Sequence, residues 1–293
     1  MRIQVIFLSL ILILIVSLAF PSLFYSHATT GKIAYEKGDN ALAKDELDFA
    51  LRTWTPGDTK EEKADVYSML GSIYMAEKDY EKALENFQQV VKLNVKQGHP
   101  HFRIGLIYAV QGKNQQAITE LKTANQDEPN FFMSQFTLAD LYRKTHQATL
   151  SIPCYIKATT LNPKSDAAHA GLGDSYRQLG KYESAIKSLE LAVKINPNNA
   201  LAHYTLGLSH SSKKEYTKAI EDYQNALNAR VITLDAFRVQ VYTFLGEAYE
   251  NTGQTEKAQE AYKQAKQLLD AIPLESNKSL PNKELLPLSS STQ

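Results

Sequence analysis

The chain has 293 residues, enough for one or two domains of ordinary size, and 43% of them are apolar, which suffices for a packed core. Its 32 basic residues are balanced by 32 acidic residues, whereas a protein that binds nucleic acid through phosphate contacts usually has a basic surplus. Nucleic acid is therefore not expected as a partner. The single cysteine, Cys154, can form neither an internal disulfide nor a thiolate zinc site.

An apolar run opens the chain from Ile3 to Phe20 and ends at Pro21. It is longer than the apolar part of most signal peptides, about 7–15 residues, and slightly shorter than the roughly 20 residues of a membrane-spanning helix. Two interpretations stay open: an uncleaved anchor that contacts the membrane through residues 3–25, or a signal segment cleaved near Ala28.

We favour the anchor, mainly because of the length of the apolar run. A second reason is that cleavage near Ala28 would cut into the first of the repeats described next. Residues 1–23 then form a single N-terminal span. The single charge of Arg2 favours keeping the N-terminus in the cytoplasm and the rest of the chain on the periplasmic or luminal side. Under the alternative, the chain is secreted after cleavage.

A repeat of 34 residues follows the apolar run. Small residues recur at this spacing, at Gly71, Gly105, Ala139, Gly173 and Gly207. Three positions after each lies a ring, at Tyr74, Tyr108, Tyr142, Tyr176 and His210. Twelve positions after each lies an alanine or serine, at Ala83, Ala117, Ser151, Ala185 and Ala219. Gly31 and Gly246 begin two further units with longer joints, so about seven units are expected.

Each unit holds two stretches with helical periodicity, and no strand-like alternation is long enough to matter. Four glycines lie between the two stretches, where a left-handed residue can end a helix, at Gly38, Gly112, Gly180 and Gly253. Prolines follow the second stretch at Pro129, Pro163 and Pro197. Pro153 falls inside a second stretch and predicts a local kink, since proline lacks the N–H of the helical ladder.

This pattern closely resembles the tetratricopeptide repeat (TPR) family, and the resemblance covers residues 24–273. It implies an all-α fold, a right-handed superhelical solenoid of about seven helix pairs whose first helices line a concave groove. Residues 274–293 are rich in Ser, Asn and Pro and are predicted to be disordered.

Nothing in the sequence points to catalysis. It has no glycine-rich phosphate loop, no serine nucleophile elbow and no HExxH. His101, His169 and His203 occupy equivalent repeat positions, so we interpret them as packing residues and not as ligands of one metal. We therefore expect no enzyme activity, no cofactor and no metal.

The family geometry implies that groove side chains lie three before, one after and four after each small residue. The candidate binding residues at these positions are Phe102, Leu106, Phe136, Arg143, Arg177, Tyr204 and Leu208. Phe102, Leu106 and Phe136 are expected to form an exposed apolar patch. The arginines could meet a partner's carboxylate, or they could merely pair with Asp140 and Asp174 on their own helices.

The leading hypothesis is a membrane-anchored scaffold that binds an extended or helical protein segment during assembly or maintenance of a membrane or envelope complex. A secreted, soluble effector or recruiting factor is a second hypothesis. A third is an accessory arm of a separately encoded enzyme.

Overall fold

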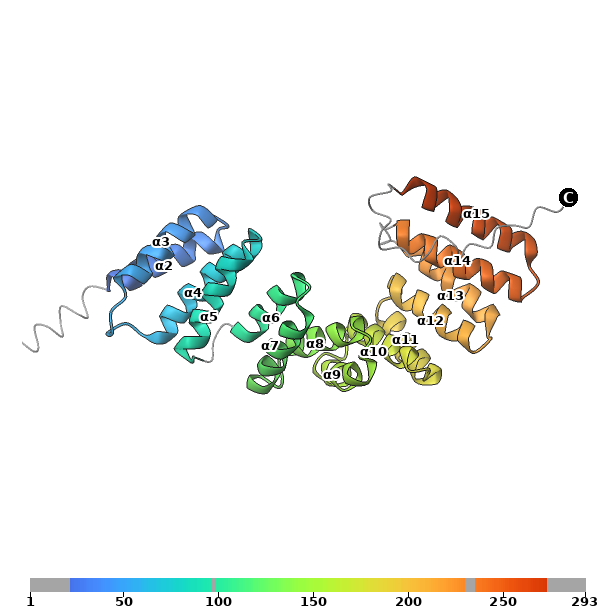
Figure 1. Ribbon diagram of the computed structural model, residues 1–293, viewed down its shortest axis with the longest axis horizontal. Helices are drawn as coiled ribbons and strands as arrows, with labels where there is room; N and C mark the ends of the chain where they lie inside the picture. Colours follow the sequence, from blue (N-terminus) through green and yellow to red (C-terminus); the bar gives the residue numbers. More distant parts are fainter. Residues whose placement is uncertain (1–21, 96–98, 230–234, 273–293) are drawn as a thin grey trace, which may run out of the picture. The chain divides into compact units, whose positions relative to one another are not determined.

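The computed structural model describes residues 22–95, 99–229 and 235–272, and within these ranges every regular element is an α-helix (Figure 1). The elements are α2 (Leu23–Glu36), α3 (Asn40–Thr53), α4 (Lys60–Ala76), α5 (Tyr80–Leu93), α6 (Pro100–Val110), α7 (Asn114–Asp127), α8 (Phe132–Lys144), α9 (Ala148–Leu161), α10 (Asp166–Gln178), α11 (Tyr182–Ile195), α12 (Ala200–Ser212), α13 (Tyr216–Asn228), α14 (Asp235–Asn251) and α15 (Thr255–Ala271).

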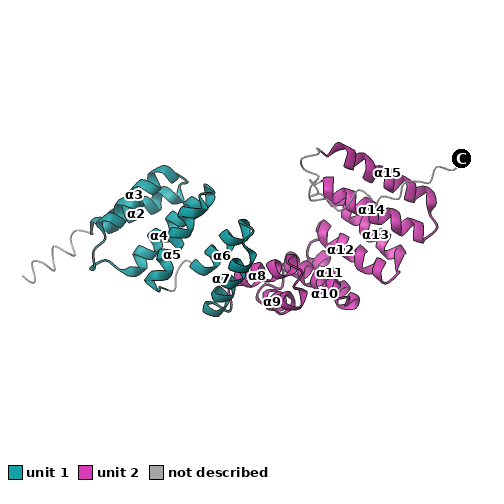
Figure 2. Cartoon of the chain, viewed as in Figure 1, with its two compact units in different colours: residues 1–129 teal, residues 130–293 magenta. Residues whose placement is uncertain are grey.

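The helices pack as seven consecutive pairs, from α2 with α3 to α14 with α15. They divide into two compact units, one of residues 1–129 and one of residues 130–293 (Figure 2). In the second unit the first helices of neighbouring pairs also touch, α8 with α10, α10 with α12 and α12 with α14. The predicted all-α fold of seven helix pairs is therefore confirmed.

Each recurring small residue packs closely against a large side chain from the second helix of its own pair. A Cβ built on Gly71 would lie 2.9 Å from Cζ of Phe87, and one on Gly105 would lie 2.9 Å from Cγ of Leu121. Real Cβ atoms do not approach other carbon atoms this closely, since optimal carbon contacts lie at about 3.5–4.0 Å. The 34-residue spacing thus records the close crossing of paired helices.

Left-handed residues separate the two helices of each pair. The four predicted glycine stops are confirmed, with φ between +70° and +78°. Lys78, His146 and Lys214 take the equivalent place in three other units and adopt φ of 64°, 57° and 63°. The helix stop therefore comes from the position in the repeat, and glycine is its most favourable occupant.

α9 continues from Ala148 to Leu161 with Pro153 inside it, so the proline does not end the helix, and the kink stays a prediction. Residues 3–21 of the predicted anchor and residues 274–293 of the predicted disordered tail lie outside the described residues. Among the helices that the structure describes, none combines the length and apolarity needed to cross a membrane.

Candidate functional site

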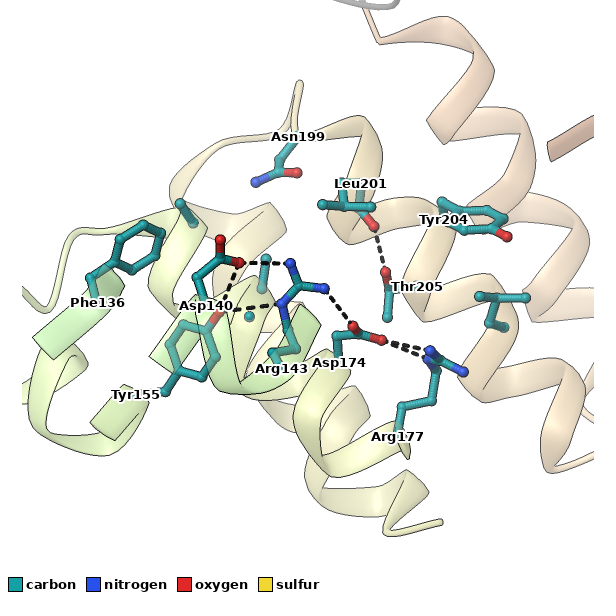
Figure 3. Close-up of a pocket in the computed structure, with 14 residues that line it drawn as sticks. Phe136, Asp140, Arg143, Tyr155, Asp174, Arg177, Asn199, Leu201, Tyr204 and Thr205 are labelled. Carbon is teal, nitrogen blue, oxygen red and sulfur yellow. Dashed lines mark hydrogen bonds and ion pairs between the residues drawn. The ribbon is translucent and has the colours of Figure 1, made fainter. Parts of the chain in front are cut away.

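A pocket of about 310 Å³ lies in the second unit, between α8, α10 and α12 and the side of α9 (Figure 3). Five of the seven predicted binding residues line it: Phe136, Arg143, Arg177, Tyr204 and Leu208. They come from three successive first helices, each contributing the repeat positions that the groove geometry selects. The structure therefore brings these five residues together.

The other two predicted residues, Phe102 and Leu106, lie on α6 in the first unit. The expectation that Phe102 is part of an exposed apolar patch is wrong, because only 6% of this residue is exposed. Repeat spacing correctly assigned it to a helix, but spacing alone does not report which side chains are covered by neighbours. Leu106 is half-buried.

A charged network forms the floor of the pocket. Arg143 donates from Nη2 to Oδ1 of Asp140 at 2.7 Å and from Nη1 to Oδ2 of Asp174 at 2.9 Å. Its Nε donates to the hydroxyl of Tyr155 at 3.3 Å. Figure 3 shows Arg143 bridging the two aspartates, which belong to neighbouring first helices. All three donor nitrogens of Arg143 are therefore engaged.

The carboxylate of Asp174 accepts hydrogen bonds at both of its oxygens. Nε and Nη2 of Arg177 donate to its Oδ1, at 2.9 and 2.7 Å, while Arg143 and Gln178 donate to its Oδ2. The within-helix pairing of Asp140 with Arg143 and of Asp174 with Arg177 is confirmed. The ion pair between Arg143 of α8 and Asp174 of α10 joins these two within-helix pairs into one network.

The network shifts the pKa of its members. Burial works to raise the pKa of Asp140, but hydrogen bonds from Lys144 and Arg143 outweigh it and lower that pKa. The pKa of Asp174 is likewise lowered, because attraction to Arg177 and Arg143 exceeds the effect of burial. Burial, followed by the charge of Asp140, raises the pKa of the Tyr155 phenol. Both aspartates are therefore ionised at neutral pH, and Tyr155 is protonated.

Arg177 differs from Arg143 in having a donor to spare. Its Nε and Nη2 both point to Asp174, whereas its Nη1 makes no hydrogen bond within the described part of the chain. Its side chain is 30% exposed, against 19% for Arg143. The guanidinium is thus held in place by Asp174 while one edge stays available at the pocket.

Apolar and aromatic side chains build the walls. The ring of Phe136 meets Tyr155 edge-on, with centroids 6.0 Å apart. Across the pocket, Tyr204 packs against Phe237 and Phe244 of α14, at 5.3 and 6.0 Å. Burial raises the pKa of Tyr204 to about 12. These contacts hold the wall residues in place without a ligand, as expected of a pre-formed binding site.

Sequence reasoning missed Tyr155 and Gly171 as pocket residues. Tyr155 follows its small residue by sixteen positions, like Phe87 and Leu121, but that small residue is Ala139 instead of glycine. Its phenol lies against Gly171 of the next pair, where an added Cβ would overlap the ring. The sequence signal for this contact is that alanine replaces glycine at the recurring position 139, while a glycine stands at 171, outside the recurring positions.

Three further pocket residues come from the start of α12 and the turn before it: Asn199, Leu201 and Thr205. Asn199 caps α12, with its side-chain oxygen accepting from the backbone of Ala202, and its amide donates to Asp166 at 2.8 Å. These three residues do not occupy the repeat positions expected to face the groove. Their place in the pocket depends on how one helix pair stacks on the next.

The repeated histidines make local contacts. His169 and His203 each approach a carbonyl of the preceding turn, that of Pro163 and that of Pro197, at 3.1 Å. His101 pairs with Glu120 at 2.7 Å. Within the described ranges, no three His, Cys, Asp or Glu side chains converge in a way that could hold a metal ion.

Family models match the chain at several places. A model described as TPR repeat matches residues 173–213, and tetratricopeptide repeat models match residues 64–96, 134–165, 200–230 and 239–268. The chain belongs to the tetratricopeptide repeat family. The predicted membership of this chain is thereby confirmed. The TPR family is a family of repeat scaffolds. The expectation that the chain has no enzyme activity stays a prediction.

Solved structures share the TPR fold. A tetratricopeptide repeat protein from Parabacteroides merdae aligns over 90% of this chain and 97% of its own length, with a TM-score of 0.61 and 17% identity. PilF of Pseudomonas aeruginosa aligns over 73% and 95%, with a TM-score of 0.59 and 15% identity. YrrB, a TPR protein with an unusual peptide-binding site, aligns over 58% and 89%, with a TM-score of 0.53 and 20% identity.

Among curated proteins, anaphase-promoting complex subunit 3 of Schizosaccharomyces pombe is 24% identical over 102 residues. The match covers 35% of this TPR protein but only 15% of the relative's length. The match therefore spans only a small part of the relative's length.

Proposed function

We propose that this protein is a scaffold that binds an extended segment of a partner protein in the pocket of its second unit. The observation that carries the proposal is the pocket itself, which combines fixed aromatic walls with a cationic edge at Arg177. Its walls are ordered by contacts within the protein, so a ligand need not order them. A peptide site is also described for YrrB, a protein of the same fold.

The pocket can be tested with two exposed leucines of the second unit. Leu201 lines the pocket and is 52% exposed, whereas Leu191 on α11 is 42% exposed and does not line it. Both can be replaced by aspartate with little effect on the core. Crosslinking in native membranes, followed by mass spectrometry, should lose its main adduct in Leu201→Asp and keep it in Leu191→Asp. Equal crosslinking in both variants would reject the pocket.

The same proposal places the scaffold at a membrane through residues 3–25, with the repeats on the periplasmic or luminal side. Phe24 supports an uncleaved N-terminus, because it is fully buried in the core with Leu47 and Leu70. Cleavage near Ala28 would remove this ring and the first turns of α2 from the first unit. Loss of a buried phenylalanine typically costs about 3–5 kcal/mol.

The mature N-terminus decides between anchoring and secretion. We expect the intact mass of the protein extracted from membranes to include residues 3–25. A mature chain that starts at Thr29 and appears in the soluble fraction would replace this proposal with a secreted TPR protein. The role that we propose for the anchored form is assembly or maintenance of a membrane or envelope complex, and crosslinked partners would name that complex.

A further inference from the structure

We propose that the partner segment carries an acidic side chain, Asp or Glu, which binds Nη1 of Arg177, next to an apolar residue that fills the pocket. This inference rests on the proposed function and specifies the chemistry of the ligand. It follows from how the donors and acceptors of the pocket floor are distributed.

The first step is the saturation of Asp174. Its two oxygens already accept four hydrogen bonds, from Nε and Nη2 of Arg177, Nη1 of Arg143 and Nε2 of Gln178. A carboxylate offers about four lone-pair sites, so Asp174 cannot accept from the remaining nitrogen of Arg177. That nitrogen is oriented by Asp174 but needs an acceptor from elsewhere.

The second step is the charge of the network. Arg143, Lys144 and Arg177 supply three cations, and Asp140 and Asp174 supply two carboxylates. The network therefore carries one positive charge at neutral pH, and the cation in excess is Lys144, which binds Asp140 at 2.7 Å but does not line the pocket. A carboxylate bound to Arg177 would balance the charge of the network, and a hydrogen bond between two charged groups is roughly twice as strong as one between neutral groups. A basic side chain would meet repulsion at the same place.

The third step is the apolar wall beside the guanidinium. Phe136, Leu201, Tyr204 and Leu208 line the pocket with Arg177. Arg177 on α10 and Tyr204 on α12 come from neighbouring first helices and line the same pocket. An apolar side chain next to the acid can therefore bury its surface while the carboxylate reaches Nη1.

An internal acidic residue fits better than a chain terminus. The pocket spans α8, α10 and α12, and α14 packs against the far side of Tyr204, so the first helices continue beyond the pocket within the second unit. A segment can thus contact the protein on either side of the acid. A free C-terminal carboxylate offers similar chemistry at Arg177, and the experiment separates the two.

Peptide display on the full-length chain in detergent tests the inference. Random peptides of about nine residues extend to roughly 30 Å, enough to span neighbouring helices. We expect wild-type protein to enrich peptides with Asp or Glu beside an apolar residue, and Arg177→Gln to enrich peptides without the acid. A selected peptide should lose about tenfold or more in affinity for the wild type when its Glu is replaced by Gln.

A double-mutant comparison guards against a misfolded variant. The Gln form of the peptide should bind wild type and Arg177→Gln about equally, and the Glu form should discriminate between them. Enriched peptides that lose binding to Leu201→Asp but show no acidic preference would overturn this inference and leave the pocket function intact. Peptides that require a free C-terminus, shown by loss on amidation, would also overturn it. No enrichment over Leu201→Asp would reject the proposed function itself.

Discussion

Substitution of Gly171 by alanine tests the most specific packing feature of the pocket. A Cβ at this position would lie 2.5 Å from Cε1 of Tyr155 and still closer to Cζ and the hydroxyl. Tyr155 is 1% exposed and its hydroxyl contacts Arg143 and Asp140, so the ring cannot swing into solvent without breaking the floor of the pocket.

Two opposing effects determine how much Gly171→Ala changes the free energy of unfolding. Alanine gains about 1 kcal/mol over glycine in a helix interior. Overpacking a close contact costs about 1–3 kcal/mol, and each displaced hydrogen bond to a charged group costs about 1.5–3 kcal/mol. With one such hydrogen bond displaced, we expect Gly171→Ala to lower the free energy of unfolding of the second unit by about 1.5–5 kcal/mol, with weaker peptide binding because the Tyr155 wall moves.

Tyr155→Leu provides the control, because Leu121 and Leu189 already occupy the equivalent position in two other units. In the Tyr155→Leu background the overlap is removed, so Gly171→Ala should become neutral or stabilising. Urea denaturation of the four proteins gives the coupling energy, expected at about 1 kcal/mol or more. A stabilising Gly171→Ala in the wild-type background would refute the packing argument.

Three further predictions concern other features of the chain. Lys214→Gly should stabilise the second unit by about 0.5–1 kcal/mol in thermal unfolding, since Lys214 holds φ at 63° and glycine adopts this conformation without strain; an unchanged midpoint would argue against it. The pKa values of Asp140 and Asp174 are lowered in the folded protein, so their ionisation stabilises the fold above their ordinary pKa of 3.8. This stability is lost as pH falls through the folded-state pKa values. Asp174→Asn and wild type should therefore converge in urea stability at acidic pH. Glu247 behaves oppositely, because burial and then Glu250 raise its pKa, so its ionisation opposes folding as pH rises; Glu247→Gln should raise the unfolding midpoint at pH 7 and not below pH 4.5, its ordinary value.

Several features of the fold follow from the sequence because they are local or strictly periodic. The crossing of each helix pair requires a small residue opposite a large one sixteen positions later, and this requirement leaves a visible 34-residue period. The helix stops at Gly112 and Gly180 are equally local, since their left-handed φ depends on the turn alone. The spacing also identified Phe136, Arg143, Arg177, Tyr204 and Leu208, because successive first helices present the same repeat positions to one face.

The tertiary structure decided which of these positions form a site. Phe102 occupies the same repeat position as Phe136 but is covered, since burial depends on neighbouring residues and not on the helix face alone. The pocket itself arises where Ala139 and Gly171 allow Tyr155 to lie across to the next helix pair, and where Arg143 reaches Asp174 on a neighbouring helix. These contacts join residues whose side chains meet only after stacking. A period in sequence describes each unit, whereas a binding site requires the three-dimensional fit between units.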